Sequence, residues 1–247
     1  MLTNKRCLVT GGSRGLGLAL CRAFAAAGAR VAFTYSRRSE DAEEARGLIQ
    51  AASPRGLAPL CFRGSVADAA HSKETVAAVC AAWGGVDVLV NNAGITQILP
   101  IALIDEAEWD EVMDVNVKGA FLFSRAVLRP MIRARAGHIL SIGSFASERI
   151  IEAPVHYAAS KAALRGFTEA LAREVGRHNI TVNLLSPGLL DVGLGRMLLP
   201  HRIKEYLSQC ALGRLGQADE VAQAAVFLVS DENRFMTGAK VVLDGGL

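Results

Sequence analysis

Tyr157 and Lys161 are spaced so that their side chains can share one reaction. They stand four residues apart at the start of a predicted helix and therefore lie on one helix face. A lysine ammonium near a phenol favours the phenolate, so we expect Lys161 to lower the pKa of Tyr157 towards a value useful for general acid–base catalysis. Solvated helix faces show the same spacing, so the interpretation depends on other polar residues.

Three further features strengthen the catalytic interpretation of this pair. Ser144 follows the predicted strand at 138–141, and the segment NNAG (91–94) ends the predicted strand at 86–91. Asn116 lies inside a predicted helix at 108–134. Asparagine is an indifferent helix former, so its presence there needs a reason.

A glycine-rich turn follows the first predicted strand, at 6–10, and precedes the helix at 16–27. Its sequence is TGGSRGLG (10–17), with glycines at 11, 15 and 17. Such a turn lets the backbone approach a pyrophosphate, which then lies at the positive end of the helix. A tight turn without a ligand is the alternative, but the position at the first strand–helix junction favours phosphate binding.

The end of the second predicted strand, at 30–35, indicates which dinucleotide binds. A carboxylate there would bond a ribose 2′-hydroxyl, whereas basic residues would accommodate a 2′-phosphate. The chain has Ser36, Arg37 and Arg38 at this place, and Arg14 rises from the glycine turn. Guanidinium groups bind phosphate well, so we predict NADP(H) rather than NAD(H). We interpret Arg38 as a solvated surface charge.

Short apolar runs alternate with helical segments along the chain. The strands are predicted at 6–10, 30–35, 57–62, 86–91, 138–141, 180–185 and 240–243, and the helices at 16–27, 40–51, 72–83, 108–134, 157–177 and 218–229. This alternation predicts a doubly wound parallel sheet of about seven strands with helices on both faces. No linker or repeat divides the sequence, so we expect one domain over 1–247.

Composition excludes several other classes of protein. The chain has 247 residues, 51% hydrophobic, and a net charge of +3, which does not indicate nucleic-acid binding. Its five cysteines contain no CxxC pair, which argues against a disulfide framework or a zinc site and suits a reducing cytosol. No apolar run is long enough to span a membrane. We therefore expect a cytoplasmic protein without a metal.

The ordered motifs resemble those of the short-chain dehydrogenase/reductase family over essentially the whole chain. They are TGGSRGLG (10–17), NNAG (91–94), Asn116, Ser144, YAASK (157–161) and SPG (186–188). Within that family, segments 166–188 and 212–246 are similar to 3-oxoacyl-[acyl-carrier-protein] reductases of fatty acid biosynthesis. The resemblance implies an NADPH-dependent oxidoreductase with a Rossmann-type fold.

The resemblance also implies a role for each catalytic residue. Tyr157 would donate a proton to the carbonyl oxygen of the substrate, and Ser144 would polarise that carbonyl. Lys161 would bond the nicotinamide ribose and lower the pKa of Tyr157. Asn116 would bind a water that links Lys161 to solvent. The cofactor-binding residues that it implies are Gly11, Ser13, Arg14, Gly15, Leu16, Gly17, Ser36, Arg37, Ser65, Val66, Asn92, Ala93, Gly94, Tyr157, Lys161, Pro187, Gly188 and Leu190. Ser65 stands where the family often has Asp or Asn, which puts an adenine contact there in doubt.

Substrate and partner expectations follow from the same resemblance. Residues 189–207 would form a mobile, apolar flap suited to an acyl chain, although an apolar packing surface has the same composition. An acidic acyl carrier protein would dock near the pocket through Arg133, Arg135 and Arg177. The alternative is that these arginines are ordinary solvated charges at the ends of helices. The family is commonly tetrameric, so we expect a homotetramer.

Two alternatives to acyl-thioester reduction remain open. The same chemistry would serve a sugar, polyol, polyketide or steroid ketone. The second alternative is a non-catalytic nucleotide-binding scaffold, since a fold does not determine a function. The presence of the four catalytic residue types weighs against the scaffold.

Overall fold

Parallel strands form the centre of the molecule. The computed structural model describes residues 1–149 and 151–247, without the side chains of residues 194 and 197. Within the described residues, one sheet contains seven strands, in the order β3-β2-β1-β4-β5-β6-β7. They are β1 (Arg6–Val9), β2 (Arg30–Tyr35), β3 (Leu60–Arg63), β4 (Val88–Asn91), β5 (Gly137–Ile142), β6 (Ile180–Pro187) and β7 (Lys240–Leu243).

The strand order creates a place for a ligand. β1 pairs with β2 on one side and with β4 on the other, so the direction of winding reverses between β1 and β4. In open parallel sheets, ligands bind outside the carboxyl ends of the strands at such a reversal. The predicted doubly wound α/β fold is confirmed.

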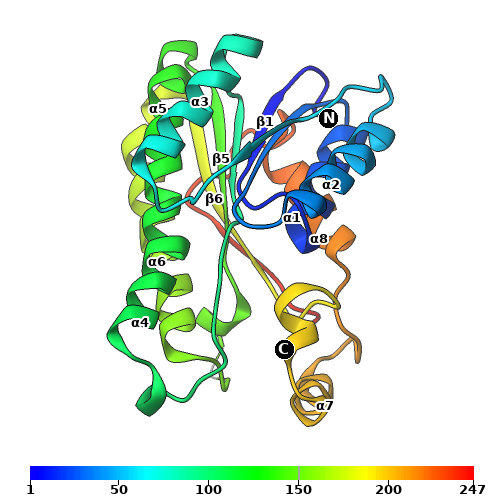
Figure 1. Cartoon of the computed structure of the whole chain (residues 1–247), viewed down its shortest axis with the longest axis vertical. Helices are drawn as coiled ribbons and strands as arrows, with labels where there is room; N and C mark the ends of the chain where they lie inside the picture. The colour runs from blue at the N-terminus through cyan, green and yellow to red at the C-terminus, as the bar shows by residue number, and fades with distance from the viewer. Residues whose placement is uncertain (150) are drawn as a thin grey trace.

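Helices cover both faces of the sheet (Figure 1). α1 (Gly15–Ala26), α2 (Ser39–Ala52) and α8 (Ala218–Leu228) cover one face, and α3 (Ala69–Trp83), α5 (Gly119–Ala134) and α6 (Val155–Val175) cover the other. α4 (Glu106–Met113) and α7 (Pro200–Gln209) lie beyond the carboxyl ends of the strands.

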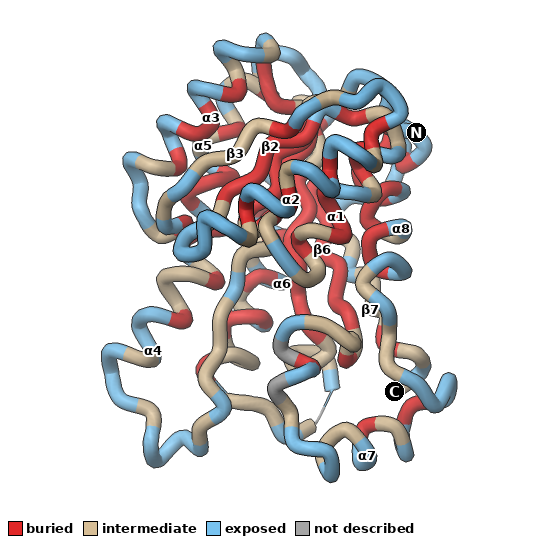
Figure 2. The backbone as a smooth tube through the Cα atoms, turned by 45° about the vertical axis from the view of Figure 1, so that its right-hand side comes forward, coloured by how far each residue is buried: buried red, intermediate tan, exposed pale blue. Residues whose placement is uncertain are grey.

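The core consists of two apolar layers separated by the sheet. Cys7 and Val9 of β1 pack towards α1 and α8, whereas Leu8 between them packs towards α5, because successive side chains of a strand point to opposite faces. Figure 2 shows the buried residues concentrated on the central strands and on the inner sides of the helices. This arrangement explains why the strands are continuous apolar runs in the sequence.

Two predicted elements differ from the structure, and one helix was not predicted. The helix expected at 108–134 is divided into α4, a π-helical turn at Asp114–Lys118 and α5. The strand expected from residue 57 begins at Leu60, because sheet pairing with β2 starts there. Helix α7 was not predicted; it begins with Pro200 at its first position, within the segment interpreted as a flap.

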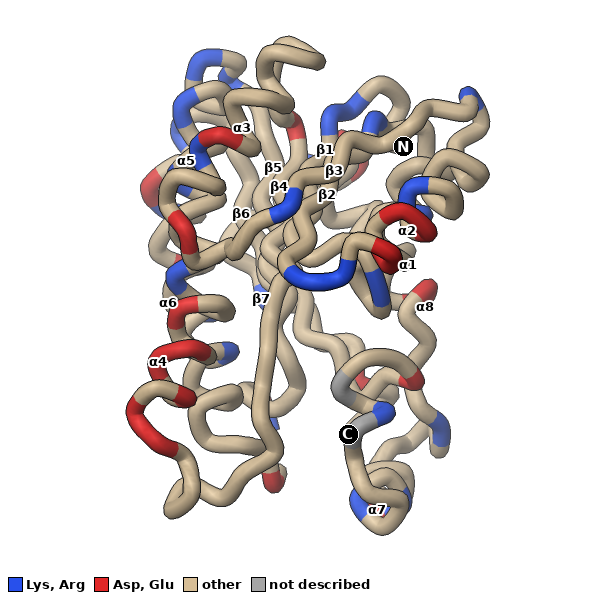
Figure 3. The backbone as a smooth tube through the Cα atoms, viewed as in Figure 1, with Lys and Arg blue, Asp and Glu red and all other residues tan. Residues whose placement is uncertain are grey.

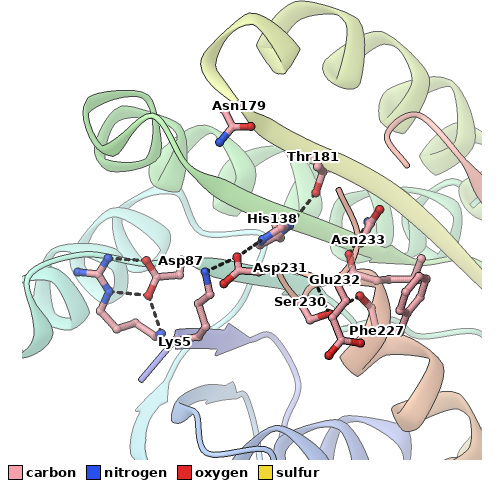
Figure 4. A network of polar contacts seen from close by, with 12 residues as sticks. Lys5, Asp87, His138, Asn179, Thr181, Phe227, Ser230, Asp231, Glu232 and Asn233 are labelled. Carbon is pink, nitrogen blue, oxygen red and sulfur yellow. Dashed lines mark hydrogen bonds and ion pairs between the residues drawn. The ribbon is translucent and has the colours of Figure 1, made fainter. Parts of the chain in front are cut away.

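The amino ends of the strands are joined by a polar network (Figure 4). Lys5 Nζ lies 2.7 Å from Asp231 Oδ1, and His138 Nδ1 lies 2.8 Å from Thr181 Oγ1. Arg6 donates from its backbone N–H and its Nε to Asp87 Oδ2, at 2.8 Å each. These contacts tie the start of β1 to the segments before β4 and after α8, and the start of β5 to that of β6, at the end of the strands opposite to the predicted site.

Candidate active site

In the glycine turn between β1 and α1, the two ends of the turn pack closely against each other. A Cβ on Gly17 would lie 2.0 Å from the carbonyl oxygen of Gly11 and 2.7 Å from Asn92 Nδ2. α1 begins at Gly15, and the preceding Arg14 provides no side-chain cap for the first N–H groups of the helix. Because those N–H groups and the helix dipole favour an anion, the turn fits a pyrophosphate.

Asn92 holds this turn against the carboxyl end of β4. Its side-chain Nδ2 donates to the carbonyl oxygens of Thr10 (2.9 Å) and Gly11 (3.1 Å). The hydroxyl of Thr10 in return accepts from the backbone N–H groups of Asn92 and Ala93. Sequence reasoning did not identify Thr10 as a functional position. Its signal was a polar residue at the end of the apolar strand and directly before the first glycine.

The residues expected to bind the adenosine half lie at the ends of β2 and β3. Ser36, Arg37 and Arg38 are exposed just after β2. The Arg37 side chain is 83% exposed and lies 3.4 Å from Glu111 Oε1, whereas Arg38 lies 3.8 Å from Asp41 on α2. Arg37 is therefore free to turn towards a 2′-phosphate, and Arg38 belongs to the surface of α2, as the sequence indicated.

Ser65 and Val66 form the turn after β3. Val66 is buried, and its side chain packs directly against Gly119 at the start of α5. The Ser65 hydroxyl accepts from the N–H of Ala67 at 3.3 Å and so supports the turn itself. The place is that expected for an adenine pocket, but the serine hydroxyl is engaged with its own backbone.

Ser144, Tyr157 and Lys161 come together at the carboxyl end of β5. Ser144 is buried and lies two residues beyond β5, whereas Tyr157 and Lys161 lie in the first two turns of α6. Lys161 Nζ lies 5.7 Å from the centre of the Tyr157 ring and donates to the carbonyl oxygen of Ile142 at 2.8 Å. The fold thus brings together the hydroxyl, phenol and ammonium groups predicted from the sequence.

The pKa shifts of this group differ from the expectation. Burial lowers the pKa of Lys161 from 10.5 to about 8. Burial raises the pKa of Tyr157, and the hydrogen bond with Ser144 lowers it only in part. The predicted lowering of the Tyr157 pKa by Lys161 is therefore wrong for the protein without ligand, because the ammonium is directed to the Ile142 carbonyl. A raised pKa keeps Tyr157 protonated at neutral pH, as a proton donor must be.

The π-helical turn at 114–118 explains the asparagine in this helical segment. Asn116 Oδ1 accepts from the N–H of Ile95 at 2.8 Å, and its Nδ2 donates to the carbonyl of Ile95 (3.0 Å) and to Ser160 Oγ (2.9 Å). Single π-helical turns occur frequently at functional sites. Both Asn116 Oδ1 and Lys161 Nζ lie against Gly94, so the second lone pair of Oδ1 can accept from a water near the lysine.

Pro187, Gly188 and Leu190 lie at the carboxyl end of β6, next to this group in the sheet. The N–H of Gly188 donates to the carbonyl of Leu243 at 2.8 Å, and Leu190 forms a parallel bridge with Gly216. The following segment, expected to be a flap, contains the short helix at Gly193–Met197 and α7. The side chains of Leu194 and Met197 within it lie outside the description.

The three arginines expected near the pocket lie at the opposite end of the strands. Arg133 and Arg135 precede β5, and Arg177 precedes β6. All three therefore lie at the amino ends of the strands, opposite to Ser144 and Pro187. Figure 3 shows basic positions at the upper end of α5, whereas acidic positions line α4. For a single chain, the expectation that these arginines lie near the pocket is wrong, because each lies in or just after the last turn of a helix that runs away from the site.

Two kinds of feature are absent from the described residues. No cluster of three or more His, Cys, Asp or Glu side chains suited to a metal ion occurs among the described residues. None of the described helices is both long and apolar enough to cross a membrane.

Comparisons with known proteins give full-length similarities. The chain matches the family model described as enoyl-(acyl carrier protein) reductase over residues 11–247. The 3-oxoacyl-[acyl-carrier-protein] reductase of Escherichia coli is 38% identical over 243 residues, which cover 98% of this chain and 97% of that protein. A short-chain dehydrogenase from Burkholderia cenocepacia in complex with NADP is 37% identical with a TM-score of 0.91, covering 99% and 98% of the two chains. Levodione reductase is 29% identical with a TM-score of 0.93, covering 100% and 98%.

Proposed function

This chain belongs to the short-chain dehydrogenase/reductase family, and from that premise we propose that it reduces the 3-oxo group of an acyl thioester to the 3-hydroxy group with NADPH. The observation that carries the proposal is the gathering of Ser144, Tyr157 and Lys161 at the carboxyl end of β5, beside the glycine turn. The 38% identity to the Escherichia coli 3-oxoacyl reductase supports the acyl thioester, and a place in fatty acid biosynthesis. The cytoplasmic location stays a prediction.

The cofactor would be held by residues at the carboxyl ends of β1, β2 and β4. The first N–H groups of α1 would bind the pyrophosphate, with the turn backed by Asn92. Arg37 and Arg14 would neutralise the 2′-phosphate, with Arg37 leaving its solvated contact with Glu111. Pro187, Gly188 and Leu190 would line the nicotinamide. Bound NADPH supplies the hydride.

The protein's part in the reaction is to place and move one proton. The hydroxyls of Ser144 and Tyr157 would both bond the substrate carbonyl oxygen. As the carbonyl carbon accepts the hydride, the oxygen takes the Tyr157 proton and the C=O becomes CH–OH. The Lys161 ammonium would stabilise the tyrosinate that remains, and a water on Asn116 would return the proton from solvent. These roles suit an oxygen acceptor, which favours carbonyl over enoyl reduction.

Docking of an acidic carrier protein would require a second subunit. Arg133, Arg135 and Arg177 lie at the amino edge of the sheet, far from the site of their own chain. In a homotetramer they would serve the site of a neighbouring subunit. Their guanidinium groups complement an acidic partner. Coenzyme A thioesters are the alternative substrates, and they need no such docking surface.

A ketone without a thioester is the second candidate. Levodione reductase is similar over the full length of the chain, and the loop after NNAG exposes Ile98 and Ile101. That apolar rim suits a hydrophobic ketone as well as an acyl chain. The same residues would carry out the same proton transfer, so the two candidates differ in substrate alone.

Loss of reduced-nicotinamide absorbance with acetoacetyl thioester tests the proposal. We expect turnover with NADPH and little with NADH, and we expect Tyr157→Phe to abolish it. Tyr35→Phe removes the same atom from a half-buried tyrosine of β2 and should retain activity. If NADPH binds but no thioester is reduced, the acyl-thioester proposal falls and a ketone panel follows. If NADPH does not bind, the result supports the non-catalytic scaffold instead.

A further inference from the structure

A buried glutamate lies four residues after Ser144 and has no part in the chemistry described above. The Glu148 side chain is 3% exposed, and its Oε2 lies 2.5 Å from Lys240 Nζ. Its Oε1 accepts from Ser186 Oγ at 3.4 Å. Burying a carboxylate is costly unless it is paired, so Lys240 is the partner that lets Glu148 occupy this position.

Glu148 contacts two serines, Ser147 and Ser186, that lie against the segment around Ser144. Ser147 donates from its hydroxyl to the Ser144 carbonyl at 2.9 Å, with Glu148 Oε1 3.4 Å away as a second acceptor. Ser186 Oγ is packed against Gly143, where a Cβ would lie 2.4 Å from it. Glu148 therefore contacts two serine hydroxyls, one bonded to the Ser144 carbonyl and the other packed beside Gly143.

The next residue makes a second connection to the same strand. Arg149 donates from Nε and Nη2 to Asp244 Oδ2, at 3.2 and 3.1 Å. Lys240 begins β7 and Asp244 follows its end, so Glu148 and Arg149 hold both ends of β7. Asp244 also accepts from Tyr206 through its carbonyl, which joins α7 to the same connection.

These side chains add to the turn's own hydrogen bonds, in which the N–H of Ser147 donates to the Ser144 carbonyl at 3.1 Å and the N–H of Ala146 donates to Ser144 Oγ at 3.2 Å. Between β5 and α6, the described regular structure is the single 3₁₀ turn at Phe145–Ser147. A hydroxyl that must lie within hydrogen-bond distance of a substrate oxygen needs a fixed backbone. We propose that Glu148, paired with Lys240, is a positioning residue that fixes Ser144 for carbonyl polarisation; this inference rests on the proposed carbonyl reduction.

Glu148→Gln tests the proposal because it keeps the size and an acceptor oxygen but removes the charge. We expect kcat for acetoacetyl thioester to fall between about 10- and 100-fold, while the Kd of NADPH stays within about twofold. The primary isotope effect with NADPH deuterated at the transferred position should rise, because hydride transfer becomes slower. Glu169→Gln is the matched control, since it removes the same charge from an exposed pair with Arg165 on α6.

Three outcomes would overturn the proposal. The first is an unchanged kcat in Glu148→Gln, and the second is a loss of NADPH binding or of the whole fold in parallel with kcat. Faster amide hydrogen exchange at residues 146–149 in Glu148→Gln is expected without any substrate, so unchanged exchange is the third. If wild type reduces no thioester, the substrate proposal fails separately, and the exchange measurement still decides the role of Glu148.

Discussion

Lys161 donates a hydrogen bond from its buried ammonium to the carbonyl oxygen of Ile142, 2.8 Å away. The acceptor is the last residue of β5, so the catalytic helix is tied to the strand that leads to Ser144. The same burial that places Lys161 beside Tyr157 lowers the pKa of the lysine to about 8. Position and acidity of this lysine therefore have one cause.

The stability of the unliganded protein should carry a signature of Lys161 at alkaline pH. Between pH 8 and 10.5 the folded state holds Lys161 neutral while the unfolded state keeps it protonated, so stability rises with pH. Below pH 8, folding carries the full cost of burying the ammonium. The stability of Lys161→Met relative to wild type should thus decrease by about 3 kcal/mol from pH 8 to 10.5. Urea unfolding at several pH values measures this, and a pH-independent difference would contradict it.

Two glycines of the nucleotide turn should respond differently to alanine. In Gly17→Ala the new Cβ would lie 2.0 Å from a carbonyl oxygen, so the turn must move and NADPH binding should be lost. Gly15 has φ +53° but no atom within 4 Å of a Cβ, so Gly15→Ala should cost about 1–2 kcal/mol through backbone strain alone. Calorimetric titration with NADPH, together with thermal unfolding, separates the two. Equal loss of binding in both variants would refute the close-contact argument.

Arg37 should determine the preference for a 2′-phosphate. Arg37→Gln removes a charge-assisted bond and should raise the Kd of NADPH about 10- to 100-fold, without changing that of NADH. The neighbouring Arg38 points to Asp41 on α2, so Arg38→Gln is the matched control and should leave both constants within about twofold. The titrations need one fixed ionic strength, because both arginines are exposed. A comparable effect of the two substitutions would show a general electrostatic attraction instead of a binding site.

His138 should make the protein less stable in weak acid. Burial lowers its pKa, and Lys5 acts in the same direction, whereas Asp231 and Asp87 oppose them. The folded state therefore holds the imidazole neutral while the unfolded state takes up a proton near pH 6.5, so stability falls as pH falls below that value. His138→Gln keeps a hydrogen-bonding group beside Thr181 and should flatten this dependence. Thermal unfolding from pH 7.5 to 5 checks it, with parallel curves counting against the role of His138.

Sequence patterns were sufficient for the strands and for the kind of chemistry. The strands are apolar runs because both faces of the sheet are covered, and each expected strand is present within a few residues. The capping box of Asp105 and Glu108 starts α4 at Glu106, two residues before the predicted start, and it depends on residues only three apart. The spacing of Tyr157 and Lys161 likewise places both on one face of α6. These features are local, so a single sequence contains them.

Tertiary structure decided what depends on residues far apart in the chain. Asn92 bonds the carbonyl of Gly11 across 81 positions, and Asn116 bonds Ser160 across 44, and neither contact has a local pattern. Burial set the pKa shifts of Tyr157 and Lys161, because desolvation is a property of the packed interior and not of a motif.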